Sequence, residues 1–252
     1  MSPSPRLFEP MTLRSTTLNN RIVISPMDQY SAVEGVPNAY HMVHYGKFAM
    51  GGAGVVFVEA TGVSEAGRIT NGCPGLYNQA QVDALKPITG FIRQQRSIPA
   101  VQIGHGGRKS STTRPWEGGG PVGDREIANG DRAWTPYGPS DLALSDGWLT
   151  PKMMDDADLA RTKQDFADAA KRALEAGFEI VFDCQTDECG GFDFRFSTEV
   201  MPAPEMHVDL GDFRFISARR EDEALGLLAS ATSREGFVQV IRAAPSGSAP
   251  VA

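Results

Sequence analysis

The sequence has few cysteines and no extended apolar run. Its 252 residues include three cysteines, Cys73, Cys184 and Cys189, and their spacing fits no zinc motif. A sparse, odd set of this kind favours a reducing compartment. The N-terminus shows no apolar signal segment, and no stretch approaches the roughly 18 consecutive apolar residues of a membrane span. We therefore expect a cytoplasmic protein with no membrane partner.

Basic residues are also in deficit. The chain carries 24 Lys and Arg against 31 Asp and Glu, a net charge of −7. Nucleic-acid binding needs a basic surface that neutralises phosphates, so the charge argues against a nucleic-acid partner. It does not exclude an anionic cofactor, because a few local donors can hold a phosphate on an acidic protein. With 41% hydrophobic residues, the chain can bury a sizeable core.

Short β-branched apolar runs alternate with amphipathic segments along the first part of the chain. This alternation is typical of an α/β protein with a parallel sheet covered on both faces. Residues 1–20 suit an irregular lid or a hairpin, and we expect 1–252 to form a single domain. The predicted strands are 21–26, 55–59, 100–104 and 179–183, and the predicted helices are 40–50, 79–96 and 155–176.

The second half is poorer in such signals. Residues 104–150 are rich in Gly, Pro and Ser and are too long for an ordinary connection, which predicts a functional loop. Beyond residue 185 we predict one strand at 213–217 and a disordered tail at 245–252, with helices at 219–231 and 234–243. The pattern thus predicts five strands, whereas a closed barrel of this class has about eight. Periodicity alone indicates an open α/β domain.

Several long, ordered motifs carry a resemblance to a known family. The chain resembles the Old Yellow Enzyme family of flavin-dependent ene-reductases, which implies a (β/α)8 TIM-barrel-like fold. Residues 1–183 match that family well and 184–244 match it with gaps, so the resemblance predicts an incomplete barrel. The matching motifs are 18–27 (LNNRIVISPM), 41–45 (HMVHY), 51–61 (GGAGVVFVEAT), 102–109 (QIGHGGRK) and 114–121 (RPWEGGGP).

The resemblance implies an FMN cofactor over the carboxyl-terminal mouth of the barrel and NAD(P)H as reductant. It places Ser25, Pro26 and Met27 along one side of the flavin and offers backbone contacts at Ala60. Gln102 would hydrogen-bond the pyrimidine part of the ring, because a carboxamide presents both a donor and an acceptor. The substrate would be a small molecule, either an activated alkene such as an enone or a quinone.

Two residues are candidates for the catalytic role. Tyr30 matches a substrate-contacting tyrosine of bacterial members, although a loop anchor is the alternative. His105 lies close to Gln102 and would face the substrate or the flavin, or have no such role. His41 and His44 are spaced to share one helix face; with no further ligand nearby, we expect helix packing rather than a metal site.

The chain also departs from the family pattern. Asp28 stands where many members have a cysteine, and a carboxylate there would lower the flavin reduction potential. The histidine pair and the tyrosine that normally follow the fourth strand are missing, because residues 183–185 run directly into 186–191. The phosphate-contacting arginine is displaced by one position to Arg214, and Gly226-Leu227 replaces a Gly-Arg phosphate clamp.

Two functional hypotheses follow. The first is an FMN-dependent oxidoreductase that transfers hydride from NAD(P)H to an activated alkene or quinone. The alternative is a catalytically impaired or repurposed family remnant, either isomerase-like or a non-catalytic binding protein. An unpaired edge on the fourth strand would pair either with residues 213–217, the one local candidate, or with another chain, so we expect a homo-oligomer or poor solubility.

Overall fold

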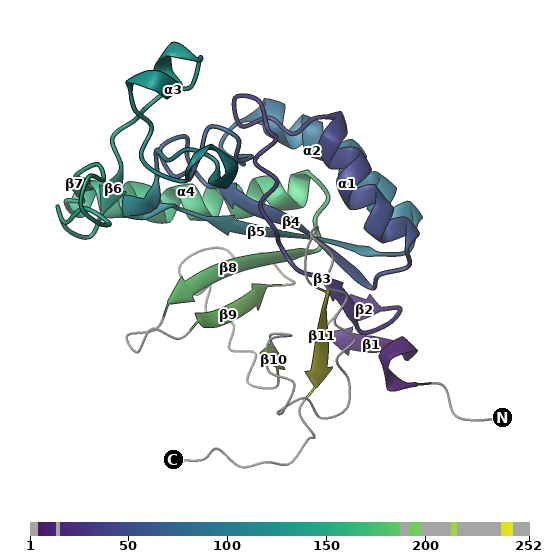
Figure 1. The fold of residues 1–252 in the computed structure, drawn as a ribbon. Helices are drawn as coiled ribbons and strands as arrows, with labels where there is room; N and C mark the ends of the chain where they lie inside the picture. Colours follow the sequence, from purple (N-terminus) through teal and green to yellow (C-terminus); the bar gives the residue numbers. More distant parts are fainter. Residues whose placement is uncertain (1–4, 14–15, 187–191, 198–212, 216–237, 244–252) are drawn as a thin grey trace, which may run out of the picture.

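The fold is a mixed β-sheet with its three long helices on one side (Figure 1). The computed structural model describes residues 5–13, 16–186, 192–197, 213–215 and 238–243. The sheet has seven strands in the order β10-β11-β3-β4-β5-β8-β9. Its four central strands are parallel neighbours, as predicted: β3 (Ile22–Ile24), β4 (Val55–Gly62), β5 (Ile98–Gly104) and β8 (Ile180–Thr186).

The long helices begin where the sequence supplies a capping side chain. The three are α1 (Ala39–Met50), α2 (Gln79–Gln94) and α4 (Asp156–Glu175). Asn38, Asn78 and Asp155 precede them, and each side chain accepts a backbone N–H of the first turn. Gly177 follows α4 with φ of 92°, a conformation that favours glycine and ends the helix.

Strand alternation divides the apolar side chains into two cores. Val56, Val58 and Val101 pack against the helices. Val55, Phe57 and Ala100 face the opposite side, together with Ile180 and Phe182. The hairpin predicted within residues 1–20 is present as β1 (Met11–Leu13) and β2 (Thr16–Leu18), and it adds Met11 and Leu18 to this second core. The hairpin packs where the central strands begin, so their carboxyl ends lie away from it.

The long segment 104–150 carries only short elements. They are η2 (Gly107–Lys109), η3 (Pro115–Glu117), α3 (Asp124–Ala128) and β6 (Tyr137–Gly138), which pairs with β7 (Lys152–Met153) just beyond the segment. A further short helix, η1 (Arg6–Phe8), precedes the hairpin. Among the described residues, no helix has the length and apolar character needed to cross a membrane.

The predictions for the second half were partly wrong. Residues 234–243 were expected to be helical, but β11 (Val238–Ala243) is a strand that pairs with β3 and with β10 (Phe213–Phe215). The edge of β8 is covered by β9 (Phe192–Ser197), which was not predicted, and not by residues 213–217. This pairing removes the reason given for self-association. Segments 219–231 and 245–252 lie outside the described residues.

The cap of α2 gives a test of the fold. Asn78→Ala removes the side chain that accepts the Gln81 N–H at 3.1 Å. We expect a loss of about 1 kcal/mol in unfolding free energy, which corresponds to a fall in Tm of roughly 2–4 °C. Gln94→Ala, at the exposed end of the same helix, is the control and should be nearly neutral. Equal melting temperatures for the two variants would show that α2 does not depend on this cap.

Candidate functional site

The carboxyl ends of three parallel strands bring the predicted flavin-side residues to one edge of the sheet. Ser25, Pro26 and Met27 follow β3 directly, and Ala60 and Gln102 lie near the ends of β4 and β5. Val58 pairs with Val101 and Thr61 with Ile103, so Ala60 sits in an irregularity between two in-register pairs. Polypeptide backbone in such a bulge is turned out of the regular ladder, which leaves it able to contact a ligand.

Gln102 is available for an external partner. Val101 and Ile103 pack toward the helices, so Gln102 points to the other side of β5, with Ala100. Its side chain is partly exposed. No residue in the described part of the chain hydrogen-bonds its carboxamide. A free donor and acceptor therefore stand together at the strand end.

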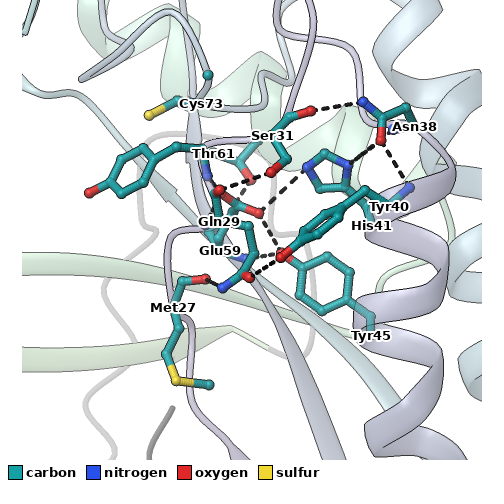
Figure 2. Close-up of polar contacts among 12 residues, drawn as sticks. Met27, Gln29, Ser31, Asn38, Tyr40, His41, Tyr45, Glu59, Thr61 and Cys73 are labelled. Atoms are coloured by element: carbon teal, nitrogen blue, oxygen red, sulfur yellow. Dashed lines mark hydrogen bonds and ion pairs between the residues drawn. The ribbon is translucent and has the colours of Figure 1, made fainter. Parts of the chain in front are cut away.

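A buried carboxylate, Glu59, joins this edge to helix α1. Its side chain is 0% exposed. Oε2 accepts the backbone N–H of Gln29 at 2.7 Å and that of Tyr30 at 3.2 Å, while Oε1 accepts the Tyr45 hydroxyl at 2.7 Å (Figure 2). The Tyr45 oxygen in turn accepts the N–H of Glu59 at 3.1 Å. One side chain thus holds together β4, α1 and the loop after β3.

The histidines of α1 complete this environment. Asn38 N–H donates to His41 Nδ1 at 3.1 Å, so the neutral ring carries its proton on Nε2, which lies 3.6 Å from Glu59 Oε1. Burial lowers the pKa of His41 to about 4. His44 stacks on Tyr40 with ring centroids 5.9 Å apart. Both histidines pack against aromatic side chains of α1. The described residues contain no cluster of three or more potential metal ligands.

The ionisation of Glu59 is a balance of opposing effects. Burial is the main reason that its pKa is raised to about 7, and the nearby charge of Asp28 also raises it. The hydrogen bonds from Tyr45, Gln29 and Tyr30 lower the pKa. The donors stabilise the carboxylate, whereas the second acid destabilises it. Sequence reasoning missed Glu59. Its only signal was an acidic residue placed directly after four buried apolar positions, Val55–Val58.

Tyr30 is held in an unusual backbone conformation. Its φ is 51°, in the left-handed region that a bulky residue rarely adopts. Its N–H is bound by Glu59 and its carbonyl accepts Arg114 Nε at 3.1 Å. Its ring lies edge-on to Trp116 at 5.7 Å, and its hydroxyl donates to Asp28 Oδ2 at 3.2 Å. These contacts fix the phenol beside the carboxyl ends of the strands, and its contact with substrate stays a prediction.

Asp28 is a second acid with an unsatisfied oxygen. Its Oδ1 is buried and has no hydrogen-bond partner among the described residues. Burial raises its pKa, against the opposing effects of the Tyr30 hydroxyl, Lys109 and the Ala60 amide. The neighbouring thiol of Cys73 has its pKa raised to about 11, mainly by burial. The thiol is therefore protonated at neutral pH and is no nucleophile.

His105 packs in the loop that follows β5. Its Nδ1 accepts the Gly107 N–H at 3.0 Å. Its ring packs against Gly67, where a Cβ would stand 2.7 Å from the ring. Burial lowers its pKa. Within the described residues no hydrogen bond connects His105 with Tyr30 or Asp28, so the structure does not join the two predicted catalytic residues, and their roles stay predictions.

The fold and site define part of a (β/α)8 barrel with its functional edge at the carboxyl ends of the strands. The profile of the NADH:flavin oxidoreductase / NADH oxidase family matches residues 6–186. The chain belongs to this family, which includes Old Yellow Enzyme, and the predicted family membership is confirmed.

Curated relatives support the same assignment. The chain is 37% identical over 183 residues to an NADH:flavin oxidoreductase of Gibberella zeae, covering 71% of this chain and 43% of that protein. It is 37% identical over 178 residues to an NADPH dehydrogenase of Bacillus licheniformis, covering 70% and 47%. The chain therefore spans less than half the length of the curated relatives that it matches.

Solved structures confirm the barrel-like fold. Morphinone reductase superposes with a TM-score of 0.57 at 27% identity, covering 71% of this chain and 47% of that chain. Old Yellow Enzyme from Pichia sp. AKU4542 gives a TM-score of 0.59 at 23% identity, with 71% and 45% covered. Since less than half of each barrel is matched, the expectation of an incomplete TIM barrel is also confirmed.

The close approach of two loops at the site gives a second test. A Cβ added to Gly72 would lie 2.1 Å from the Tyr30 carbonyl oxygen, whereas one added to Gly90 meets nothing within 4 Å. Gly72→Ala should destabilise the fold by about 1–3 kcal/mol through overpacking. Gly90→Ala, within α2, should stabilise it by roughly 0.5–1 kcal/mol. Denaturant unfolding measures both, and a stabilised Gly72→Ala variant would contradict the described position of Tyr30.

Proposed function

We propose that this chain binds FMN and acts as an oxidoreductase that takes hydride from NAD(P)H and transfers it to an activated alkene, such as an enone, or to a quinone. The observation that carries this proposal is the carboxamide of Gln102, partly exposed and without a hydrogen-bond partner in the described part of the chain, beside the bulged backbone at Ala60. Both lie at the strand ends within the family match. Relatives named NADPH dehydrogenase support NAD(P)H as the reductant.

The residues present fit the ring of the proposed cofactor. A flavin edge alternates donors and acceptors, and a free carboxamide at Gln102 matches such an edge. Ser25, Pro26 and Met27 follow the adjacent strand and would line one side of the ring. Arg214, the displaced candidate for the phosphate, lies in β10, where only the backbone is described.

The protein's part in the proposed chemistry is binding and orientation. When bound, FMN would supply the capacity to accept and donate hydride, which no side chain possesses. Tyr30 presents a phenol that is fixed by Asp28 and Trp116, so we propose that it contacts the substrate at this edge. His105 is the second proposed substrate-facing residue. We further propose a cytoplasmic protein that acts on a small molecule and has no nucleic-acid partner.

One observation favours an impaired or repurposed function as the alternative. Strand β8 continues to Thr186 through Asp183, Cys184 and Gln185, so no histidine stands at its carboxyl end. The strand then pairs with β9. An isomerase-like activity, or binding without catalysis, would need no carbonyl-gripping histidine pair.

Cofactor binding is the most direct consequence of the proposal. Protein purified with FMN should be yellow, and Gln102→Ala should weaken FMN binding by about 1–3 kcal/mol because a polar partner is left unpaired. That corresponds to roughly 5- to 150-fold in the dissociation constant, measured by quenching of flavin fluorescence. Gln94→Ala serves as the control. A protein that binds no FMN would refute the proposed function, whereas an unchanged constant for Gln102→Ala would remove only that residue.

The missing histidines predict slow alkene reduction. Loss of one preorganised donor to a developing oxyanion costs roughly 10²–10³ in rate. We therefore expect cyclohexenone reduction at least that much slower than by the Bacillus licheniformis NADPH dehydrogenase, while NAD(P)H oxidation by a dye persists. Steady-state assays of both reactions separate the two steps. Equal cyclohexenone rates would show that other residues, such as Tyr30 and His105, stabilise the oxyanion.

A further inference from the structure

The loop after β3 is fixed at two consecutive backbone amides by one buried side chain. Glu59 Oε2 accepts the N–H groups of both Gln29 and Tyr30. The same loop begins with the proposed flavin-side residues 25–27 and carries the Tyr30 phenol. Two further ties at the start of α1 are neutral: the Tyr40 hydroxyl donates to Gln29 Oε1 at 2.9 Å, and Asn38 Nδ2 donates to the Ser31 carbonyl at 2.8 Å (Figure 2). Glu59 is therefore an ionisable link between the loop and the core.

The donors around Glu59 stabilise its ionised form against the cost of burial. Two backbone N–H groups and the Tyr45 hydroxyl donate to the carboxylate, and the protonated Nε2 of His41 lies 3.6 Å away. An ionised carboxylate is a pure acceptor, whereas a protonated one must itself donate. A proton on either oxygen would meet these donors, so at least one of them must be displaced or must reorient.

The conformation of Tyr30 makes the loop sensitive to this change. A non-glycine residue in the left-handed region costs roughly 1–3 kcal/mol and persists only where its surroundings enforce it. The enforcing contacts are Glu59 at the N–H and Arg114 at the carbonyl, with Gly72 leaving room for that carbonyl. Weakening the contact at the N–H removes one of the two polar restraints on the Tyr30 backbone.

We propose that Glu59 is a positioning residue: its carboxylate holds Gln29 and Tyr30 in place, and ligand binding against this loop is thereby linked to the ionisation of Glu59. The link to FMN rests on the proposed function. The positioning of the loop by Glu59 does not rest on the proposed function, because it is a property of the ligand-free chain.

The groups that face Glu59 define the pH range of the effect. His41 and Tyr45 face it from α1, and Asp28 and Tyr30 face it from the loop after β3. With the pKa of Glu59 raised to about 7 by burial, the carboxylate forms as pH rises from 6 to 8. The pKa of His41, lowered to about 4, keeps that ring neutral throughout. The loop should therefore be held more firmly at pH 8 than at pH 6.

The first arm of the test follows the loop amides in ligand-free protein. In ¹⁵N-labelled protein titrated from pH 5 to 9, the amide resonances of Gln29 and Tyr30 should shift with one shared midpoint near 7. Glu59→Gln should abolish this titration. Tyr45→Phe, which removes a stabilising donor, should move the midpoint to higher pH, and Asp28→Asn, which removes a like charge, should move it to lower pH. If Glu59→Gln fails to fold, the opposite shifts of the midpoint in Tyr45→Phe and Asp28→Asn still show whether Glu59 is the group that titrates.

The second arm measures FMN binding. One linked proton can change affinity by up to about tenfold between pH 6 and 8. The ratio of the wild-type FMN affinity to that of Glu59→Gln should therefore rise from pH 6 to pH 8. Taking this ratio at each pH cancels the titration of the FMN phosphate, which affects both proteins equally. A ratio independent of pH overturns the linkage, and loop amides without a shared midpoint overturn the positioning role. If FMN does not bind while the amides titrate, the proposed function fails and the positioning role stands.

Discussion

The buried carboxylate of Glu59 is the interaction on which the described site depends. An ionised acid in an apolar interior is costly unless donors surround it. Here the donors come from two consecutive elements, the loop after β3 and helix α1, which meet Glu59 on β4. The carboxylate is thus tolerated because it accepts the N–H groups of Gln29 and Tyr30, and it fixes where Tyr30 stands.

The parallel strands explain why the site forms at this edge. Parallel neighbours end together, so the residues that follow β3, β4 and β5 converge, while the β1–β2 hairpin packs at the opposite ends of the strands (Figure 1). This is the functional edge of (β/α)8 barrels in general. This chain matches less than half of the length of its relatives, yet it retains this edge. The strands that build the edge all lie within residues 6–186.

The central strands and long helices from β3 to β8, and the strand β10, could be predicted from the sequence, whereas β9 and β11 could not. Strand β4 begins with a continuous apolar run, Val55–Val58, and lies between two capped helices, so local pattern suffices. Val238–Ala243 becomes a strand by pairing with β3, near the opposite end of the chain, and such a non-local partner leaves no local signal. The same reason hid Glu59, since its partners are assembled only by the fold. Ser25, Ala60 and Gln102, named through the family resemblance, lie near the ends of β3, β4 and β5, and their contacts with a cofactor stay proposals.

The central claim is that the edge formed by the loop after β3 and the ends of β4 and β5 is a flavin-binding edge. Mapping backbone amide shifts during titration of ¹⁵N-labelled protein with FMN tests it most directly. The account predicts that the largest changes fall within residues 25–30, 59–62 and 102–107, including the amides held by Glu59. Changes confined to other segments, with these resonances unmoved at saturating FMN, would contradict it.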